Sequence, residues 1–403
     1  MANPNTHWQR TVMIMFLAQL VTAIGFSSIF PFLPLYVLKL GSSTGLNVEL
    51  LTGLVFSAQA FTMMIASPVW GALADHFSRK LMVERAMFGG SLVLMTMSSV
   101  RSAEQLVFLR AVQGLVTGTI GASNALVAAT VPRERIGYAM GLLQTAMGIG
   151  VAVGPPLGGI IGDIYGYPAV FRVTSILLFV SGLMVWIGVE EKDDKRGHEA
   201  FQGIDIIGRW RRVLRGPGVL ITYGIRFLNQ SSRMVFLPVL PLLVQQILAK
   251  DVPLNTFTGL IVGAGSATAT LSAAWLGYLG DRTDHRSILI GCCFISFLLY
   301  LMQGSVTTGW QLLFLQALAG LFLGGILPAI TALLAHLTEG GEEGAVYGLD
   351  NAISSGARMI APVIGVKAAH LFGLRSVFII SAFFYLTAGI LGTWNFYGSK
   401  PRE

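Results

Sequence analysis

The sequence predicts an all-α membrane protein with twelve transmembrane helices in two pseudo-symmetric six-helix halves. Three observations lead to this prediction. Of the 403 residues, 54% are hydrophobic and only 12% are charged, whereas soluble domains carry about 25% charged residues. Twelve apolar runs are each long enough to cross a bilayer core of about 30 Å. The second half of the chain also repeats the first at a nearly constant spacing.

The predicted spans follow one another through mostly short loops. They cover residues 11–38, 50–74, 80–100, 104–131, 135–163, 167–189, 217–248, 255–280, 286–306, 310–337, 343–371 and 375–396. Runs of this length exclude a β-barrel, whose strands have about 10 alternating residues. The first run is too long for a cleaved signal peptide. We therefore expect an N-terminal half over 1–190, a cytoplasmic linker over 191–216 and a C-terminal half over 217–403.

The internal repeat is clearest between Gly137–Phe171 and Gly344–Phe378, which align without a gap at an offset of 207 residues. Three further pairs align at offsets of 206 or 207 residues: 31–37 with 238–244, 71–80 with 277–286, and 104–118 with 310–324. Parallel repeats of this kind are one transporter architecture, with the substrate site near the middle of the membrane between the repeats.

Basic residues are concentrated in one set of loops. This set holds Arg79, Lys80, Arg133, Arg135, Lys192, Lys195, Arg196, Arg209, Arg211, Arg212, Arg215, Arg282 and Arg286, and the opposite set holds Lys39, Arg101, Lys250 and Arg375. Because cytoplasmic loops are enriched in Lys and Arg, both termini are predicted to be cytoplasmic. The net charge of +7 therefore needs no nucleic-acid partner. The adjacent Cys292 and Cys293 lie in an apolar run and are interpreted as core residues.

The polar segment from Glu190 to Gly216 has two possible interpretations. Its second part, GRWRRVLRG, has the pattern of a short basic amphipathic helix on the anionic inner leaflet. The alternative is a solvated linker between the halves.

Three short patterns carry most of the functional information: GALADHFSRK at 71–80, RAVQG at 110–114 and GVAVGPPLGG at 150–159. A charge within a span costs at least about 2.5–3.5 kcal/mol, so Arg110 is expected to face a cavity or a partner. The alternative is that Arg110 extends to the outer interface. Small residues at 150–159 permit close helix packing, and the proline pair is expected to bend the helix and free carbonyl groups.

With these patterns and the repeat, the chain resembles the major facilitator superfamily over essentially its whole length, and it is most similar to the drug:proton antiporter branch. The resemblance implies that the 71–80 loop, with Gly71, Asp75, Arg79 and Lys80, latches the outward-facing state. Ser78 and His76 depart from the family pattern, which usually has Gly and often Arg there, and Ser78 is expected to weaken the tight turn.

The resemblance also assigns roles to the other two patterns. It links Arg110 to proton transfer. It makes the pattern at 150–159 the signature of exporters, through Gly150, Gly154, Pro155, Gly158 and Gly159. An isolated pair of glycines four residues apart would carry little weight, whereas the whole pattern in the fifth span favours export over uptake.

Polar residues inside the predicted spans suggest the substrate and proton sites. Arg226, Asn229, Gln230 and Arg233 form a stripe on the seventh helix, and the eleventh adds Asp350, Ser354 and Arg358 on roughly one face. The first and seventh helices line the central cavity in the family. The predicted substrate-binding residues are Gln19, Phe26, Arg226, Asn229, Gln230, Arg233 and Arg358.

Asp350 is the only acidic residue well inside a predicted span. We expect it to carry the proton, or to act as a switchable partner of Arg226 or Arg233. The alternative is a permanent structural ion pair. Arg110 and Asp75 are the other predicted proton-coupling residues. Three arginines against one aspartate make the cavity basic, so neutral, anionic or zwitterionic amphiphiles are expected as substrates.

The expected function is export of small amphipathic molecules from a bacterial cell across its inner membrane, by alternating access and driven by protons. The sequence has no G-x-x-x-x-G-K-[ST] motif for ATP, so an ion gradient is expected as the drive and no cofactor or metal is expected. The expected partners are the substrate, protons and the bilayer, with the protein acting as a monomer.

Three other functions were considered. The same scaffold would suit an importer or anion exchanger, which the basic cavity suggests and the pattern at 150–159 opposes. A non-transporting sensor or scaffold would not need Asp75, Arg79, Arg110 and Gly154-Pro155. An enzyme is disfavoured because the predicted spans contain no His pair and no Ser-His-Asp arrangement.

Overall fold

The described part of the protein is entirely helical between its turns and loops, as the sequence predicts. The structure is a computed structural model that describes residues 4–76, 78–132, 135–190, 206–337 and 343–395. Its helices are α1 Pro4–Ile29, α2 Leu33–Leu40, α3 Val48–His76, α4 Arg79–Met97, α5 Ala103–Val116, α6 Thr119–Thr130, α7 Ile136–Tyr165, α8 Tyr167–Gly188, α9 Ile206–Arg215, α10 Val219–Val235, α11 Leu240–Ile247, α12 Leu254–Arg282, α13 His285–Gln303, α14 Gly309–Leu337, α15 Glu343–Phe372 and α16 Ser376–Thr393.

Nine stretches of the described residues are long and apolar enough to cross a membrane, and the pair α10 and α11, bent by 45°, makes a tenth. The other two predicted spans correspond to α4 and α15. Both form helices, but charged residues make them less apolar, including Arg79 and Glu84 in α4 and Asp350 and Arg358 in α15. The protein is therefore a multi-pass membrane protein, and the count of twelve stays a prediction at these two helices.

Three predicted spans are interrupted, and two of the interruptions repeat. Residues 30–32 separate α1 from α2, and residues 236–239 separate α10 from α11. Pro31 and Pro238 occupy equivalent places in these breaks, and a proline inside a helix removes a backbone donor and collides with the preceding turn. The third break separates α5 from α6 at Gly118, whose φ of 127° favours glycine.

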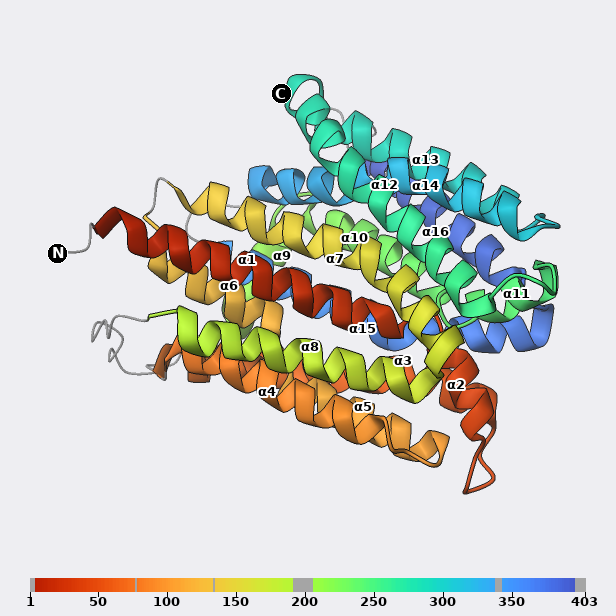
Figure 1. Cartoon of the computed structure of the whole chain (residues 1–403). Helices are drawn as coiled ribbons and strands as arrows, with labels where there is room; N and C mark the ends of the chain where they lie inside the picture. The colour runs from red at the N-terminus through yellow and green to blue at the C-terminus, as the bar shows by residue number, and fades with distance from the viewer. Residues whose placement is uncertain (1–3, 77, 133–134, 191–205, 338–342, 396–403) are drawn as a thin grey trace. The chain divides into compact units, whose positions relative to one another are not determined.

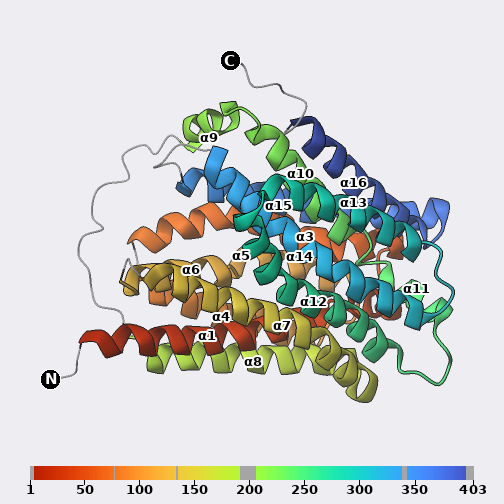
Figure 2. The same cartoon turned by 90° about the horizontal axis from the view of Figure 1, so that it is seen from above.

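The first of two compact units contains Met1–Leu51, Ala58–Ala200 and Pro253–Gly263. In it, α1 packs against α6, α7 and α8, and α4 packs against α5, α6 and α8. Figures 1 and 2 show α7 and α8 alongside α1. A buried apolar cluster that includes Val12, Met15, Val83, Leu126 and Leu143 joins these helices at its core.

The second unit contains Thr52–Ser57, Phe201–Val252 and Ala264–Glu403. Its helix α10 packs against α14, α15 and α16, while α13 packs against α14 and α16. These pairings follow those of the first unit, with α10 in the place of α1, α15 in the place of α7 and α16 in the place of α8. The sequence repeat is therefore also a repeat of tertiary packing.

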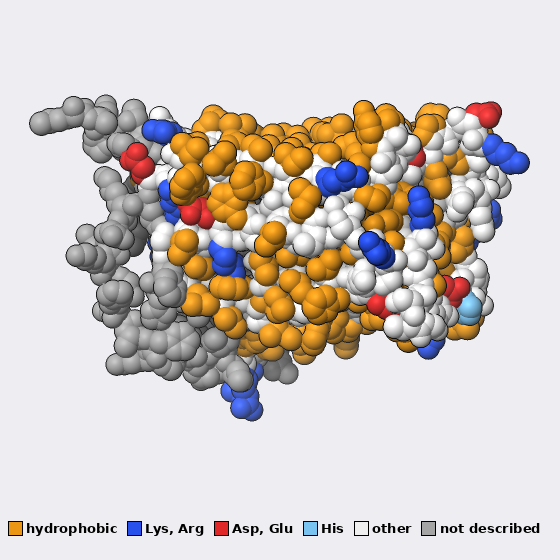
Figure 3. All heavy atoms as spheres, turned by 60° about the horizontal axis from the view of Figure 1, so that its bottom comes forward, with side chains coloured by type: hydrophobic (Ala, Val, Ile, Leu, Met, Phe, Trp, Pro, Cys, Tyr) orange, Lys and Arg blue, Asp and Glu red, His pale blue; other side chains and the backbone are white. Residues whose placement is uncertain are grey.

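The second part of the polar segment forms a helix, α9, which packs against α10 and α15. The linker residues 191–205 lie outside the described residues. Large hydrophobic side chains are exposed on many helices, including Leu92, Phe108, Trp186, Leu271 and Phe383. Hydrophobic side chains cover much of the central part of the face in Figure 3, as expected of a surface in contact with lipid. Cys292 and Cys293 are buried and unpaired, as predicted for core residues.

Candidate functional site

An ion pair between Arg226 on α10 and Asp350 on α15 is the centre of the candidate site in the second unit. Arg226 Nε donates to Asp350 Oδ1 at 2.8 Å, and Nη2 donates to Oδ2 at 3.2 Å. This two-pronged geometry is the strongest form of guanidinium–carboxylate contact. Arg226 has only 9% of its surface exposed, so most of its charge is compensated by this carboxylate. Of the two arginines predicted as partners of Asp350, the structure selects Arg226.

Arg233 and Arg358 lie near this pair without sharing its carboxylate. Arg358 Nε donates to the carbonyl of Ser354 at 3.3 Å, and its guanidinium interacts electrostatically with Arg226, Asp350 and Arg233. Both side chains are partly buried. The structure thus brings three of the predicted substrate-binding arginines into one group around a single carboxylate.

The other predicted residues of the substrate site are amides and one aromatic ring. In α10, Asn229 is buried and its Oδ1 has no hydrogen-bond partner, while Gln230 is partly buried. In α1 of the first unit, the buried Gln19 also has an unpartnered Oε1, and Phe26 is partly buried. A buried amide oxygen without a donor costs about 1–3 kcal/mol. Each oxygen could therefore gain a hydrogen bond only if the packing around it opened to a donor.

Arg110 on α5 is buried rather than directed to the membrane surface. Its exposed fraction is 2%, which excludes the alternative in which it extends to the interface. Nη1 donates to Gln113 Oε1 at 2.8 Å, and Gln113 is itself fully buried. Both belong to the RAVQG pattern, and Gly114 of that pattern lies against Gln59 and Thr62 of α3.

The loop pattern at 71–80 ends α3 and begins α4. Ser78 is the N-cap of α4, and its Oγ accepts from the backbone N–H of Leu81 at 3.1 Å. The serine thus supplies a helix cap that glycine, with no side-chain acceptor, could not. Lys80 Nζ donates to the carbonyl of Trp186 at 2.8 Å and lies 3.6 Å from Glu84. Arg79 occupies the first turn of α4, and the side chains of Gly71 and Asp75 lie outside the described residues.

The pattern at 150–159 brings α7 into close contact with α1. A Cβ atom on Gly150 would collide with Ala23, and one on Gly154 would collide with Ser27. Gly158 is equally close to the backbone of Ser28. These contacts support the prediction that small residues here serve close packing.

The proline pair lies inside α7. The helix α7 is continuous through Pro155 and Pro156. Hydroxyl donors do come from α1: Ser27 Oγ donates to Gly150 O and Ser28 Oγ donates to Gly154 O, both at 2.9 Å. The carbonyls that the two prolines deprive of a donor are those of residues 151 and 152. The serines therefore hold α7 through glycine carbonyls instead.

Gly159 and Asp163 place the end of α7 against the start of α12, within the first unit. A Cβ atom on Gly159 would collide with the carbonyl of Asn255. Asp163 Oδ1 accepts from Asn255 Nδ2 at 2.7 Å, and Oδ2 accepts from the Thr256 N–H at 2.8 Å and its Oγ1 at 2.6 Å. The carboxylate thus caps the N-terminus of α12. Sequence reasoning missed this role, although Asp163 is the first charged residue in the long apolar stretch of α7.

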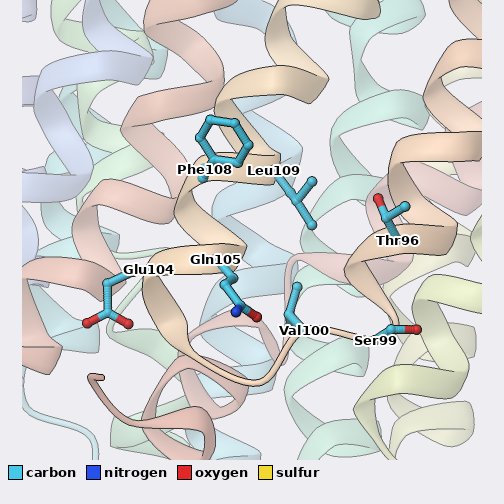
Figure 4. Close-up of a pocket in the computed structure, with 7 residues that line it drawn as sticks. All are labelled: Thr96, Ser99, Val100, Glu104, Gln105, Phe108 and Leu109. Atoms are coloured by element: carbon cyan, nitrogen blue, oxygen red, sulfur yellow. The ribbon is translucent and has the colours of Figure 1, made fainter. Parts of the chain in front are cut away.

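A surface groove of about 460 Å³ lies elsewhere in the first unit, at the end of α4 and the start of α5 (Figure 4). It is lined by Thr96, Ser99, Val100, Glu104, Gln105, Phe108 and Leu109. None of the predicted site residues lines it. Glu104 is engaged by the loop after α2, where it accepts from Ser42 Oγ at 2.6 Å and Thr44 Oγ1 at 2.8 Å.

Sequence comparison gives matches over nearly the whole chain. The family described as the Major Facilitator Superfamily matches residues 15–226 and 222–403. The multidrug resistance protein MdtG of Yersinia enterocolitica is 31% identical over 401 residues, covering 98% of this chain and 94% of the relative. The protein of the same name from Enterobacter lignolyticus is 32% identical over 378 residues, covering 93% and 90%.

Solved structures show the same fold at low identity. A bacterial homologue of the human lysosomal transporter Spinster, solved in an inward-facing and occupied conformation, aligns over 100% of both chains with a TM-score of 0.79 at 12% identity. The human organic anion transporter MFSD10 aligns over 96% of this chain and 99% of its own with a TM-score of 0.67 at 16% identity. At these identities the likeness concerns the fold alone.

Proposed function

Because the chain belongs to the Major Facilitator Superfamily, a family of membrane transporters, we propose that it exports small amphipathic molecules by alternating access, driven by proton influx. The observation that carries this proposal is the identity of 31% to a multidrug resistance protein over nearly the full length of both chains. The tight contact between the pattern at 150–159 and α1 also supports it, since this pattern is what favoured export in the sequence. We further propose that the protein acts as a monomer.

The proposed location is the inner membrane of a bacterial cell, with both termini in the cytoplasm. The support is the concentration of basic residues in one set of loops. The ends of α3, α9 and α12 and the start of α4 then lie on the cytoplasmic side. The helix α9 carries Arg211, Arg212 and Arg215, which suits it to an anionic leaflet.

Asp350 is the proposed proton carrier, because its charge is compensated by Arg226 alone at hydrogen-bond distance. Protonation would turn the carboxylate from an acceptor into a neutral acid and release Arg226 from the ion pair. The helices α10 and α15 would then lose the charged contact that joins them. A proton can thereby shift the equilibrium between two conformations of the protein. The size of this shift is set by the difference between the proton affinities of the two conformations. Arg110 and Asp75 are proposed to act in the same coupling.

A second candidate function follows from the sign of the charges around Asp350. Three arginines surround one carboxylate, so the group is positive and suits neutral or anionic substrates. Protonating Asp350 makes it more positive, and by Coulomb attraction alone a proton and an anion would favour each other's binding. That relationship suits uptake of an anion with protons, or anion exchange, whereas antiport needs a conformational change that reverses the sign.

Proton movement in proteoliposomes tests the proposal. A pH-sensitive dye would report proton flux on addition of cationic, neutral and anionic amphiphiles to wild-type protein and to Asp350→Asn. We expect protons to move opposite to a neutral or anionic compound, and this flux to disappear in the variant. Movement of protons with the anion would favour the second candidate. Flux that survives in Asp350→Asn would exclude Asp350 as the carrier.

A further inference from the structure

Arg233 on α10 and Arg358 on α15 form no ion pair with a carboxylate of the described residues. Within the described part of α10, α13, α14 and α16 and the interior of α15, Asp350 is the only acidic residue. It is taken by Arg226, with both oxygens accepting. A charge within a membrane protein is normally paired or faces water, so Arg233 and Arg358 require an explanation.

Arg233 and Arg358 lie at similar levels on α10 and α15, because Arg226 pairs with Asp350 on one side of them and Val235 lies against Gly365 on the other. Arg358 interacts electrostatically with Arg233 as well as with Arg226 and Asp350. Both residues are only partly buried. Two like charges held near each other inside a membrane repel, and an anion between them removes this repulsion. The arrangement therefore favours a bound anion over an empty site.

Two tyrosines lie near the end of α10, where Tyr300 packs against Phe236, about one turn after Arg233, with ring centroids 5.7 Å apart. Tyr300 on α13 and Tyr385 on α16 are fully buried, and their ring centroids are 5.2 Å apart. Both interact electrostatically with Arg233. A phenol oxygen accepts from a guanidinium and its O–H donates to an oxyanion. Tyr300 and Tyr385 are thus placed to orient Arg233.

The fold does not require this cluster of arginines and tyrosines, because the first half of the protein has other residues at the equivalent positions. At the repeat offset of 207 residues, Arg233 corresponds to Phe26, Arg358 to Val151 and Asp350 to Leu143. Tyr385 corresponds to Leu178 at the same offset, and Tyr300 corresponds to Leu94 at the offset of 206 residues that the neighbouring segments share. In the first unit, Phe26 and Leu178 indeed meet beside Gly90. One half of the protein thus packs apolar side chains where the other half gathers cations and phenols, which indicates a function beyond packing.

We propose that Arg233 and Arg358 together bind one oxyanion group, a carboxylate or a sulfonate, of an amphipathic substrate, with Tyr300 and Tyr385 positioning Arg233. Guanidinium groups suit this ligand because their N–H donors match the two oxygens of a carboxylate. Arg226 pairs with Asp350, so the arginines that bind the oxyanion differ from the arginine that holds the proposed proton carrier. The inference deepens the proposed function and rests on it for the identification of the ligand as the transported molecule.

Equilibrium binding tests the site without any proton gradient. Purified full-length protein in detergent is titrated with naphthalene-2-carboxylate, naphthalene-2-sulfonate and the uncharged 2-naphthamide, and each affinity is obtained from the ligand dependence of the melting temperature. We expect the two anions to bind at least about tenfold more tightly than the amide, as charge-assisted hydrogen bonds outweigh neutral ones. Equal affinity for carboxylate and amide, or no stabilisation by either anion, would overturn the proposal.

Variants assign the preference to these residues. Arg233→Gln and Arg358→Gln should each weaken carboxylate binding about tenfold or more and leave the amide unchanged, while the Lys variants should retain part of the preference. Arg375→Gln removes an exposed arginine from the same unit and should change nothing. If both Gln variants bind the carboxylate like the wild type, or if Arg375→Gln weakens it equally, the assignment is wrong. Melting without ligand shows whether each variant is folded.

The tyrosines have their own control. Tyr300→Phe and Tyr385→Phe should lower the ratio of carboxylate to amide affinity several-fold by removing only a hydroxyl. Tyr223→Phe removes the hydroxyl of another buried tyrosine, which donates to the Val346 carbonyl at 3.0 Å, and should leave that ratio unchanged. A purely structural role would lower melting temperatures without changing the ratio. If the arginine variants bind the carboxylate normally while substrate-driven proton flux is present, the anion site is wrong and the proposed function stands. If the variants lose carboxylate binding while no proton flux is found, the anion site stands and the proposed function is wrong.

Discussion

Arg226 on α10 and Asp350 on α15 share two hydrogen bonds, of 2.8 and 3.2 Å, although 124 positions separate them in the sequence. Neither the repeat nor any short motif predicts this pairing, because the equivalent residues in the first half are Gln19 and Leu143. The pair ties together two helices that carry the predicted binding residues. It is therefore the contact from which coupling between proton and substrate can be tested.

The first prediction concerns the stability of this pair. Arg226→Gln should lower the melting temperature because it leaves the Asp350 carboxylate partly buried without its cation, at a cost of about 1–3 kcal/mol. The double variant with Asp350→Asn should recover much of the loss, since both charges are then absent. Melting of the purified protein measures each step. Additive losses in the double variant would show that the two residues contribute independently.

The second prediction uses Asp350 as a probe of the charge balance. Asp350→Asn should increase the affinity for naphthalene-2-carboxylate several-fold, because it removes the carboxylate that pairs with Arg226 and interacts with Arg358. Asp251→Asn, in the exposed loop between α11 and α12, removes the same charge at a distance and should have no effect. The melting titration described above measures both. Weaker carboxylate binding in Asp350→Asn would contradict a positively charged site.

The third prediction concerns the cap that Asp163 makes on α12. Asp163→Ala should increase hydrogen exchange at the backbone amides of Asn255 and Thr256, which donate to this carboxylate at 3.2 and 2.8 Å. The loss of a cap typically costs about 0.5–2 kcal/mol, so exchange there should rise several-fold while the middle of α12 is unchanged. Hydrogen–deuterium exchange with mass spectrometry resolves the two regions. An unchanged exchange rate in the first turn of α12 would show that Asp163 does not stabilise the start of this helix.

The fourth prediction tests the close packing of α7 on α1. Gly154→Ala should destabilise the protein by about 1–3 kcal/mol, because the added methyl group meets Ser27 Oγ and the Ile24 carbonyl. Gly162→Ala on the same helix is the matched control, since its nearest neighbours would be 3.8 Å away. Melting temperatures compare the two. Equal effects would show that helix propensity, rather than steric contact, decides the outcome.

A double variant separates the two collisions at Gly154. Adding Ser27→Ala removes the hydroxyl but leaves the Ile24 carbonyl in place. We therefore expect only partial recovery of the melting temperature, and full recovery would mean that the backbone can move away. The same variant also loses the hydrogen bond from Ser27 Oγ to Gly150 O, so Ser27→Ala alone is needed as the reference.

Several features could be predicted from the sequence because they depend on composition and periodicity. Apolar runs of sufficient length must form helices in a bilayer, where every backbone group needs an internal partner. The offset of 207 residues that aligns 31–37 with 238–244 also predicts that the two halves share a pattern of helix packing. The alignment even places Pro31 and Pro238 together, although the helix breaks at these positions were visible only in the structure.

Other features depended on distances between residues remote in the sequence. The sequence offered Asp350 two possible arginine partners, and only the geometry of α10 against α15 selected Arg226. The sequence left two possible positions for the Arg110 side chain, facing a cavity or partner or extending to the outer interface. In the structure, the side chain is buried and donates to Gln113. The capping role of Asp163 depends on the start of α12 lying beside it, and the sequence does not show that proximity.

The sequence by itself determined the class of the protein, the repeat and the list of charged residues inside the membrane. These properties are local or periodic. The length and hydrophobicity of each apolar run are the same in any arrangement of the helices. Tertiary structure decided which of those charges are neutralised. Coulomb and hydrogen-bond energies fall steeply with distance. The contact of 2.8 Å with Asp350 therefore neutralises Arg226, whereas Arg233 and Arg358 form no ion pair with a carboxylate of the described residues.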